Sequence, residues 1–104
     1  MRGLLLRMTG RGRGMYEVYM VECRDGSLYT GISTDPERRA RVHNSGHGAK
    51  YTRSRLPVTL CYREPQPDKG TALRRECAIK RLTRAEKLAL IAEYQQKTHR
   101  GEEA

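Results

Sequence analysis

Five polar side chains in this 104-residue chain offer the chemistry needed to cut a phosphodiester bond. A tyrosine can act as a base if a neighbouring cation or metal ion lowers its pKa from the ordinary value near ~10. An arginine stabilises negative charge on phosphate, a histidine can assist proton transfer, and a carboxylate can hold a divalent ion. The residues that carry these groups are Tyr19, Tyr29, Arg39, His43 and Glu76.

Arg39 and His43 are four residues apart in a segment that reads as a helix. Asp35 can cap the free amides and Pro36 fits the first helical position, so we expect the helix to run to about Asn44. Residues four apart project from the same helix face. The alternative is that the pair belongs to a solvated, arginine-rich surface.

Glu76 falls within the apolar arc of a second expected helix, Thr71–Leu82, between Ala72 and Ile79. An inward carboxylate needs a partner, because burying an unpaired charge is costly. Lys80, one turn further on, is the structural candidate. The functional alternative is a single divalent ion, Mg²⁺ or Mn²⁺, with water molecules in its other coordination positions.

Tyr19 and Tyr29 lie in two expected strands, Tyr16–Cys23 and Leu28–Ser33, joined at Asp25-Gly26. A two-residue turn would put the two rings on opposite faces of the hairpin, whereas an odd-length loop with a glycine bulge would put them on the same face. We predict the odd register. The alternative role for both tyrosines is a core position with the hydroxyl reaching the surface.

The remaining segments complete a β-β-α-β-α-α order. A third strand is expected over Pro57–Arg63 and is broken by Pro65, and a last helix begins at Thr83, which opens a capping-box pattern. The first strand has apolar residues on both faces, as a central strand does, and Gly46 allows a left-handed exit from the first helix. This order predicts an α/β (α+β) fold, a small sheet flanked by helices.

Length and composition indicate a single domain at residues 15–96, with a basic arm at 1–14 and a frayed tail at 97–104. Met15 is an alternative start. The formal net charge is 21 − 12 = +9, which favours a polyanionic partner. No apolar run approaches a membrane span, and the three scattered cysteines form no Cys-x-x-Cys pair. We therefore expect a cytoplasmic protein with no membrane partner.

Basic residues gather between the first helix and the third strand, with no acid among them from residue 38 to residue 55. Such a run is a candidate phosphate track, with an aromatic side chain available for a base or a sugar. The alternative is an ordinary solvated loop. The candidate nucleic-acid-binding residues, with one cation from the later helix, are Arg38, Lys50, Tyr51, Arg53, Arg55 and Lys80.

Together these segments resemble the GIY-YIG nuclease superfamily over roughly residues 16–94, and most closely its small stand-alone bacterial proteins, which are often labelled only as an uncharacterised family. The resemblance rests on Tyr29-Thr30-Gly31-Ile32, Asp35-Pro36-Glu37-Arg38-Arg39, His43-Asn44-Ser45-Gly46, the stretch from Gly48 to Arg53, and Glu76 followed by Ile79-Lys80. It implies a three-stranded antiparallel sheet with flanking helices.

By the same resemblance, Tyr19 and Tyr29 match the tyrosines of the two name-giving motifs, Arg39 matches the catalytic arginine, and Glu76 matches the metal-binding glutamate. His43 matches a position that is often His or Tyr. The first motif departs from the family pattern, because Glu17 stands where glycine is usual.

The implied activity is Mg²⁺- or Mn²⁺-dependent endonucleolytic cleavage of DNA with low sequence specificity, in repair or recombination. Relatives usually borrow affinity from an attached recognition domain, so we expect weak activity or a protein partner that supplies specificity. Two alternatives remain: a non-catalytic module that binds DNA or RNA on the same scaffold, and an interaction protein that docks through its basic face.

Overall fold

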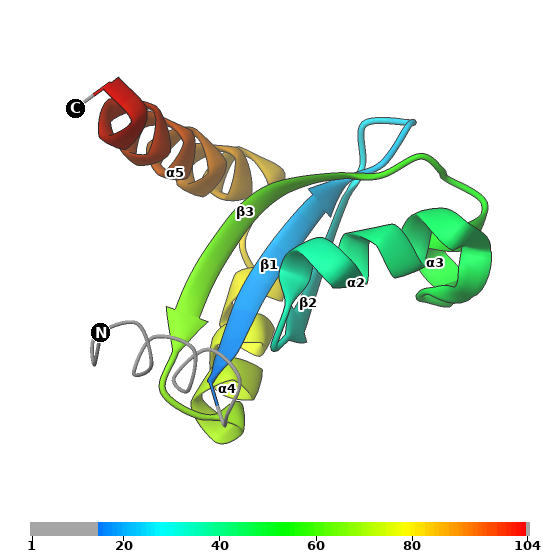
Figure 1. The fold of residues 1–104 in the computed structure, drawn as a ribbon, viewed down its shortest axis with the longest axis horizontal. Helices are drawn as coiled ribbons and strands as arrows, with labels where there is room; N and C mark the ends of the chain where they lie inside the picture. The colour runs from blue at the N-terminus through cyan, green and yellow to red at the C-terminus, as the bar shows by residue number, and fades with distance from the viewer. Residues whose placement is uncertain (1–14, 104) are drawn as a thin grey trace, which may run out of the picture.

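The chain folds into a three-stranded antiparallel sheet with helices on both faces (Figure 1). The computed structural model describes residues 15–103, with side chains described up to Thr98, so the predicted basic arm at 1–14 lies outside the described residues. The sheet order is β2-β1-β3. The elements are β1 (Tyr16–Glu22), β2 (Leu28–Ser33), α2 (Pro36–Val42), η1 (His43–His47), α3 (Lys50–Arg53), β3 (Thr59–Gln66), α4 (Lys69–Lys80) and α5 (Arg84–Glu103). The predicted class and element order are confirmed.

The central strand β1 is covered on both faces, as its two-sided apolar pattern predicts. Val18 and Met20 lie in a core cluster with residues of α4 and α5, whereas Tyr19 and Val21 lie in a second cluster on the other face. Figure 1 shows α2 in front of the sheet and α4 behind it. Alternate residues of one strand therefore serve two different layers.

The β1–β2 hairpin has the predicted odd register. Tyr19 pairs with Gly31 and Tyr29 pairs with Val21, so the two tyrosines share the face that α2 covers. The loop is closed by the Cys23 amide, which donates to the carbonyl of Ser27 over 2.8 Å. Gly26 has a φ of +86°, a left-handed conformation that glycine adopts without steric cost.

Helices α2 and α4 each begin at an aspartate whose side chain caps free backbone amides. Asp35 accepts a hydrogen bond from the Arg38 amide at the start of α2, as predicted. Helix α4 begins two residues earlier than expected, at Lys69, because Asp68 caps it by accepting from the Thr71 amide over 2.8 Å. This cap was not predicted from the sequence.

The third strand is shifted from its predicted bounds, Pro57–Arg63, to Thr59–Gln66. Pro65 does not break it, because β3 is an edge strand, where proline is tolerated. The start moves because Asn44 holds Val58 by two hydrogen bonds, of 2.7 and 2.9 Å, to its backbone amide and carbonyl.

The first and last helices also differ from their predicted ends. Helix α2 ends at Val42 and continues as the wider turn η1, in which Gly46 has the expected left-handed φ of +88°. The segment expected to be a loop contains the short helix α3. Helix α5 extends beyond Gln96, where a frayed end was expected, to Glu103. Among the described residues, no helix is both long enough and apolar enough to cross a membrane.

Candidate active site

Tyr19 and His43 form a buried hydrogen-bonded pair between β1 and the end of α2. The Tyr19 hydroxyl lies 2.9 Å from His43 Nε2, and the two residues are only 1% and 0% exposed. Nδ1 of the same ring lies 2.9 Å from the hydroxyl of Thr52, which is also fully buried. The structure therefore brings together two residues that are 24 positions apart in the sequence.

Two glycines make room for this pair. A Cβ at Gly31 would lie 2.8 Å from the Tyr19 hydroxyl, and a Cβ at Gly48 would lie 2.3 Å from His43 Nδ1. Real Cβ atoms do not approach other atoms so closely, so the ring positions depend on both glycines. Neither glycine was predicted from the sequence to shape the site.

The electrostatics of the pair follow from burial and from the charges nearby. Burial raises the pKa of Tyr19 to about 12; Tyr29 and, more weakly, Glu76 raise it, whereas the Arg39 guanidinium lowers it through a hydrogen bond and its charge. Burial lowers the pKa of His43 below its ordinary value of 6.5, and the charge of Arg39 lowers it further. Tyr19 is thus a protonated phenol and His43 a neutral imidazole at pH 7.

Tyr29 is the more accessible of the two tyrosines and begins a row of stacked side chains. Its ring centroid lies 5.3 Å from that of His43, in an edge-on arrangement, and 6.1 Å from that of Tyr51, nearly parallel. The guanidinium carbon of Arg55 lies 3.9 Å from the Tyr51 ring centroid, and Arg55 is tied to Asp25 by an ion pair of 3.1 Å. This row connects the hairpin with the segment around α3.

Arg55 and Tyr51 therefore have structural roles in addition to the predicted nucleic-acid contacts. Arg55 also donates to the Tyr51 carbonyl over 2.7 Å, so part of its hydrogen-bonding capacity is used within the protein. Tyr51 remains 40% exposed. Their contribution to nucleic-acid binding stays a prediction.

Glu76 points inward, as its position in the apolar arc predicts: its side chain is only 16% exposed. Its Oε2 forms an ion pair of 3.2 Å with Lys80, the partner that the sequence suggested. No hydrogen bond to Oε1 is found among the described residues, and no buried side-chain oxygen there lacks a partner, so Oε1 is not fully buried. The carboxylate is close enough to Tyr19 to affect the pKa of that phenol.

A single magnesium or manganese ion fits this carboxylate. Residues 15–98 contain no group of three or more His, Cys, Asp or Glu side chains that could enclose a metal. Mg²⁺ does not need such a cage, because it commonly takes one or two carboxylates and completes its shell with water and substrate phosphate oxygens. In such a site, Oε1 of Glu76 would supply the one protein ligand.

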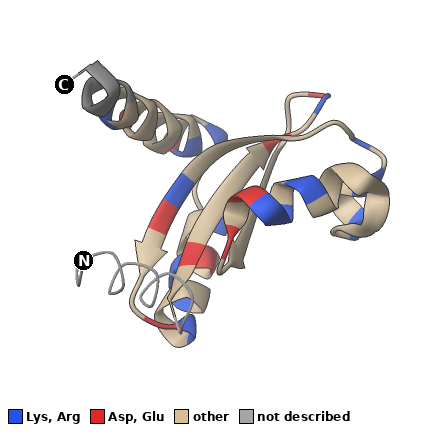
Figure 2. Ribbon diagram, viewed as in Figure 1, with Lys and Arg blue, Asp and Glu red and all other residues tan. Residues whose placement is uncertain are grey.

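A groove of about 250 Å³ runs along the β2 edge beside the tyrosines. It is lined by Leu28, Tyr29, Thr30, Tyr51, Lys80 and Lys87, so α4 and α5 contribute cations to a wall opposite aromatic rings. The predicted cations Arg38, Lys50 and Arg53 are exposed on α2 and α3, where Figure 2 shows basic bands. These surfaces flank the Tyr19–His43 pair.

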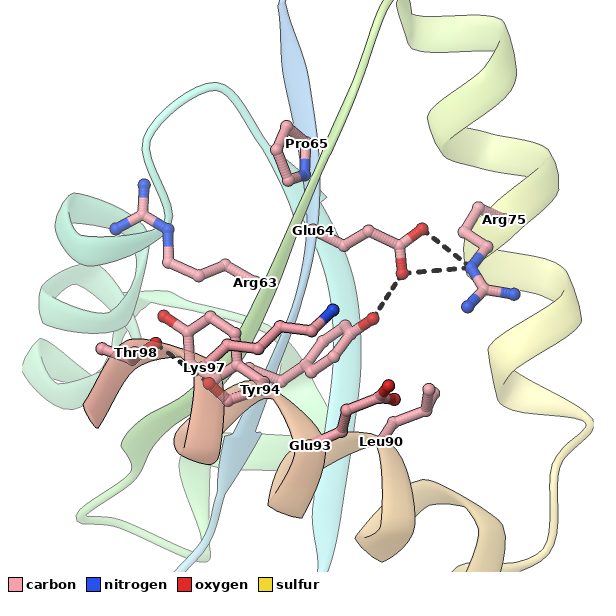
Figure 3. Close-up of a pocket in the computed structure, with 10 residues that line it drawn as sticks. Arg63, Glu64, Pro65, Arg75, Leu90, Glu93, Tyr94, Lys97 and Thr98 are labelled. Carbon is pink, nitrogen blue, oxygen red and sulfur yellow. Dashed lines mark hydrogen bonds and ion pairs between the residues drawn. The ribbon is translucent and has the colours of Figure 1, made fainter. Parts of the chain in front are cut away.

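A larger hollow, of about 600 Å³, lies between β3, α4 and α5, on the other side of the sheet (Figure 3). Two of its charged groups are paired with each other: Arg75 Nε lies 2.9 Å from Glu64 Oε2, and the Tyr62 hydroxyl donates to the same carboxylate. None of the five predicted catalytic residues lines it. Size alone therefore does not identify the chemical site.

The departure at Glu17 has a structural explanation. Both Glu17 oxygens accept from Arg63, over 2.9 and 2.8 Å, and Arg63 also pairs with Glu37 at 3.3 Å. This triad joins β1, β3 and α2. The glutamate therefore has a local structural role and does not require a place in the catalytic chemistry.

The comparisons with known proteins agree with this fold. The GIY-YIG catalytic domain family matches residues 15–89. A UPF0213 protein of Halobacterium salinarum is 55% identical over 77 residues, covering 74% of this chain and all of that protein. A UPF0213 protein of Streptococcus sanguinis is 54% identical over 76 residues, covering 73% and 87%. The solution NMR structure of EF2693 from E. faecalis is similar with a TM-score of 0.51 and 39% identity, covering 84% of this chain and 88% of that one.

Proposed function

Because the chain belongs to the GIY-YIG catalytic domain family, an endonuclease superfamily, we propose that it is a metal-dependent endonuclease. Its substrate is DNA, which it cleaves with low sequence specificity in repair or recombination. A protein partner supplies substrate specificity. The family match covers most of the described chain, so the proposal concerns the domain as a whole.

The observation that carries the proposal is the gathering of four groups around the Tyr19 hydroxyl. His43 is hydrogen-bonded to it, and the pKa of Tyr19 responds to Tyr29, Arg39 and Glu76. These residues come from β1, β2, α2, η1 and α4. A fold that needs only a core has no reason to bring a phenol, an imidazole, a guanidinium and a carboxylate to one point.

Each group has a distinct role in hydrolysis. Tyr29, half-buried beside the groove, is the base: its hydroxyl first loses its proton to solvent, and the phenolate then accepts a proton from the attacking water, which the Tyr19–His43 pair orients. Arg39 stabilises the negative charge on the pentavalent phosphate. A divalent ion held by Glu76 would supply stabilisation of the leaving oxygen.

The cationic surfaces position the sugar-phosphate backbone. Lys80 lies in the groove, while Arg38, Lys50 and Arg53 extend the basic surface along α2 and α3. Contacts to phosphate carry little sequence information. This is the reason for expecting low sequence specificity.

Two observations favour a second candidate, a non-catalytic module that binds DNA or RNA. Lys80 already neutralises one oxygen of Glu76, and burial keeps the Tyr19 phenol protonated. In that case the same groups hold phosphate and no bond is cut. The basic surface would serve either function.

A nicking assay on supercoiled plasmid with Mg²⁺ separates the two candidates. We expect nicking by the wild type, none in excess chelator, and a loss of about 10²–10³-fold in Glu76→Ala. Glu93→Ala, which removes an exposed carboxylate on α5, is the matched control and should nick normally. Retained DNA binding with an equal, metal-insensitive background in all proteins would establish the binding module instead.

A further inference from the structure

Behind the Tyr19–His43 pair lies a third buried polar group, the hydroxyl of Thr52. Its Oγ1 lies 2.9 Å from His43 Nδ1 and 2.8 Å from the carbonyl oxygen of Ala49. Thr52 is 0% exposed, so water cannot replace either contact. A threonine hydroxyl has only one hydrogen to donate, and the two contacts compete for it.

Chemistry decides the direction of both hydrogen bonds. The Ala49 carbonyl can only accept, so both Thr52 contacts are satisfied only when Thr52 donates to Ala49 and His43 Nδ1–H donates to Thr52. The neutral ring then has its lone pair on Nε2, where the Tyr19 hydroxyl can donate to it over 2.9 Å.

The opposite tautomer leaves a buried group unsatisfied. With the hydrogen on Nε2, the ring would donate to Tyr19, and the Tyr19 hydrogen would need another acceptor. Among the described residues, the only hydrogen-bonding partners given for the Tyr19 hydroxyl are His43 Nε2 and the Arg39 guanidinium, and Arg39 can only donate. The Ala49 amide, 3.4 Å from Nδ1, would gain an acceptor in this tautomer, but that contact is longer than the three hydrogen bonds it would disturb.

We propose that Thr52 is a positioning residue that fixes His43 as the Nδ1–H tautomer, so that the Tyr19 hydroxyl donates to His43 Nε2. The Tyr19 oxygen then keeps its lone pairs. It can accept a hydrogen bond from Arg39 or from the attacking water. Gly48 allows this arrangement, because its missing Cβ leaves space for Nδ1. The catalytic consequence rests on the proposed nuclease function, but the hydrogen-bond direction does not.

The direct test is long-range ¹H–¹⁵N NMR of the histidine rings at pH 7.5, with His43→Gln used to assign the signals. The wild type should show Nδ1 protonated and Nε2 as an unprotonated acceptor. Thr52→Val, which replaces the hydroxyl with a methyl group of similar size, should lose this pattern, and Thr52→Ser should keep it. A wild-type ring protonated on Nε2, or an unchanged tautomer in Thr52→Val, would overturn the proposal.

The wild-type spectrum decides the hydrogen-bond direction even if Thr52→Val does not fold. In nicking assays, a folded Thr52→Val should lose about 10-fold or more in kcat with KM unchanged, and Thr52→Ser should stay near the wild type. If the wild type is inactive while its ring is protonated on Nδ1, the nuclease function fails and the assignment of the tautomer stands. The two ideas can therefore fail separately.

Discussion

Two buried tyrosines, Tyr19 and Tyr62, lie on opposite faces of the same sheet and differ mainly in their partners. Burial is the main cause that raises the pKa of each to about 12. The Tyr62 hydroxyl donates to Glu64, a carboxylate that Arg75 already pairs. The hydroxyl of Tyr19 instead contacts a neutral imidazole.

The difference shows that a buried phenol with a raised pKa does not by itself mark a reactive site. Around Tyr62, each charge is balanced by a neighbour, which suits a structural network. Around Tyr19, a cation that lowers its pKa, a second phenol and a partly open carboxylate lie within electrostatic range. The capacity for chemistry is therefore expected on the Tyr19 side, although the larger hollow is on the other side.

The largest expected difference between the Tyr19 side and the Tyr62 side is in the nicking rate after one arginine is removed from each. Arg39→Ala should lower the nicking rate by about 10²–10³-fold, because charge on the phosphate loses its stabilising group. Arg75→Ala should leave nicking intact and cost about 1 kcal/mol of unfolding free energy, because Glu64 loses a partly exposed partner. Single-turnover nicking and urea denaturation measure the two effects. Equal loss of activity in both variants would remove the distinction between the two sides.

A steric test addresses how the Tyr19 side is packed. Gly48→Ala should lower the unfolding free energy by about 2–3 kcal/mol, because the new Cβ meets His43 at 2.3 and 2.7 Å. Gly26→Ala is the control, because a Cβ added there would meet open space. Its φ of +86° is strained for alanine, so we expect the unfolding free energy to fall by about 1 kcal/mol. Urea unfolding followed by circular dichroism compares them. A smaller loss in Gly48→Ala than in Gly26→Ala would contradict the packing around His43.

The pH dependence of stability should report His43. Because its pKa is lower in the folded state, the unfolded chain binds a proton first as the pH falls below 6.5, and stability drops from that point until the folded pKa is passed. The carboxyls of Asp25 and Asp68, whose folded pKa values lie below 3.8, contribute only at lower pH. Urea unfolding between pH 7.5 and 5 should therefore show a slope that is reduced in His43→Gln. An unchanged slope would mean that His43 is not held neutral by its surroundings.

The smallest expected effect is on the salt dependence of DNA binding. Lys80→Ala should reduce the slope of log binding constant against log salt by about 0.9 for duplex DNA, the amount expected for one phosphate contact. Lys97→Ala removes an exposed lysine beside the larger hollow and should leave the slope unchanged. Fluorescence anisotropy over a salt series measures both. The reverse pattern would place the nucleic acid on the β3–α5 side.

The sequence was enough to predict the element order and the class, because these follow from local signals. The odd hairpin register was predicted from the site, which requires Tyr19 and Tyr29 to share one face. The alternation of apolar residues in β1 predicted a two-sided strand, and Asp-Gly was compatible with the odd loop that places Tyr19 and Tyr29 on one face. The helix caps at Asp35 and Thr83 were equally local. Such signals need no knowledge of distant partners.

The details that depend on distant contacts could not be predicted in this way. The start of β3 depends on Asn44, which holds a backbone 14 residues away, and Pro65 is tolerated only because β3 is an edge strand. Thr52 and Gly48 shape the site because they touch His43 in space. A single sequence read by itself gives no sign of that contact.

Replacing each of the two buried tyrosines by phenylalanine tests the central claim most directly, because each change removes only a hydroxyl from a comparable environment. The measurement is the single-turnover nicking rate with Mg²⁺, on variants shown to be folded. The account predicts a loss of about 10²-fold in Tyr19→Phe and a rate close to that of the wild type in Tyr62→Phe. Equal rates in the two variants would contradict it.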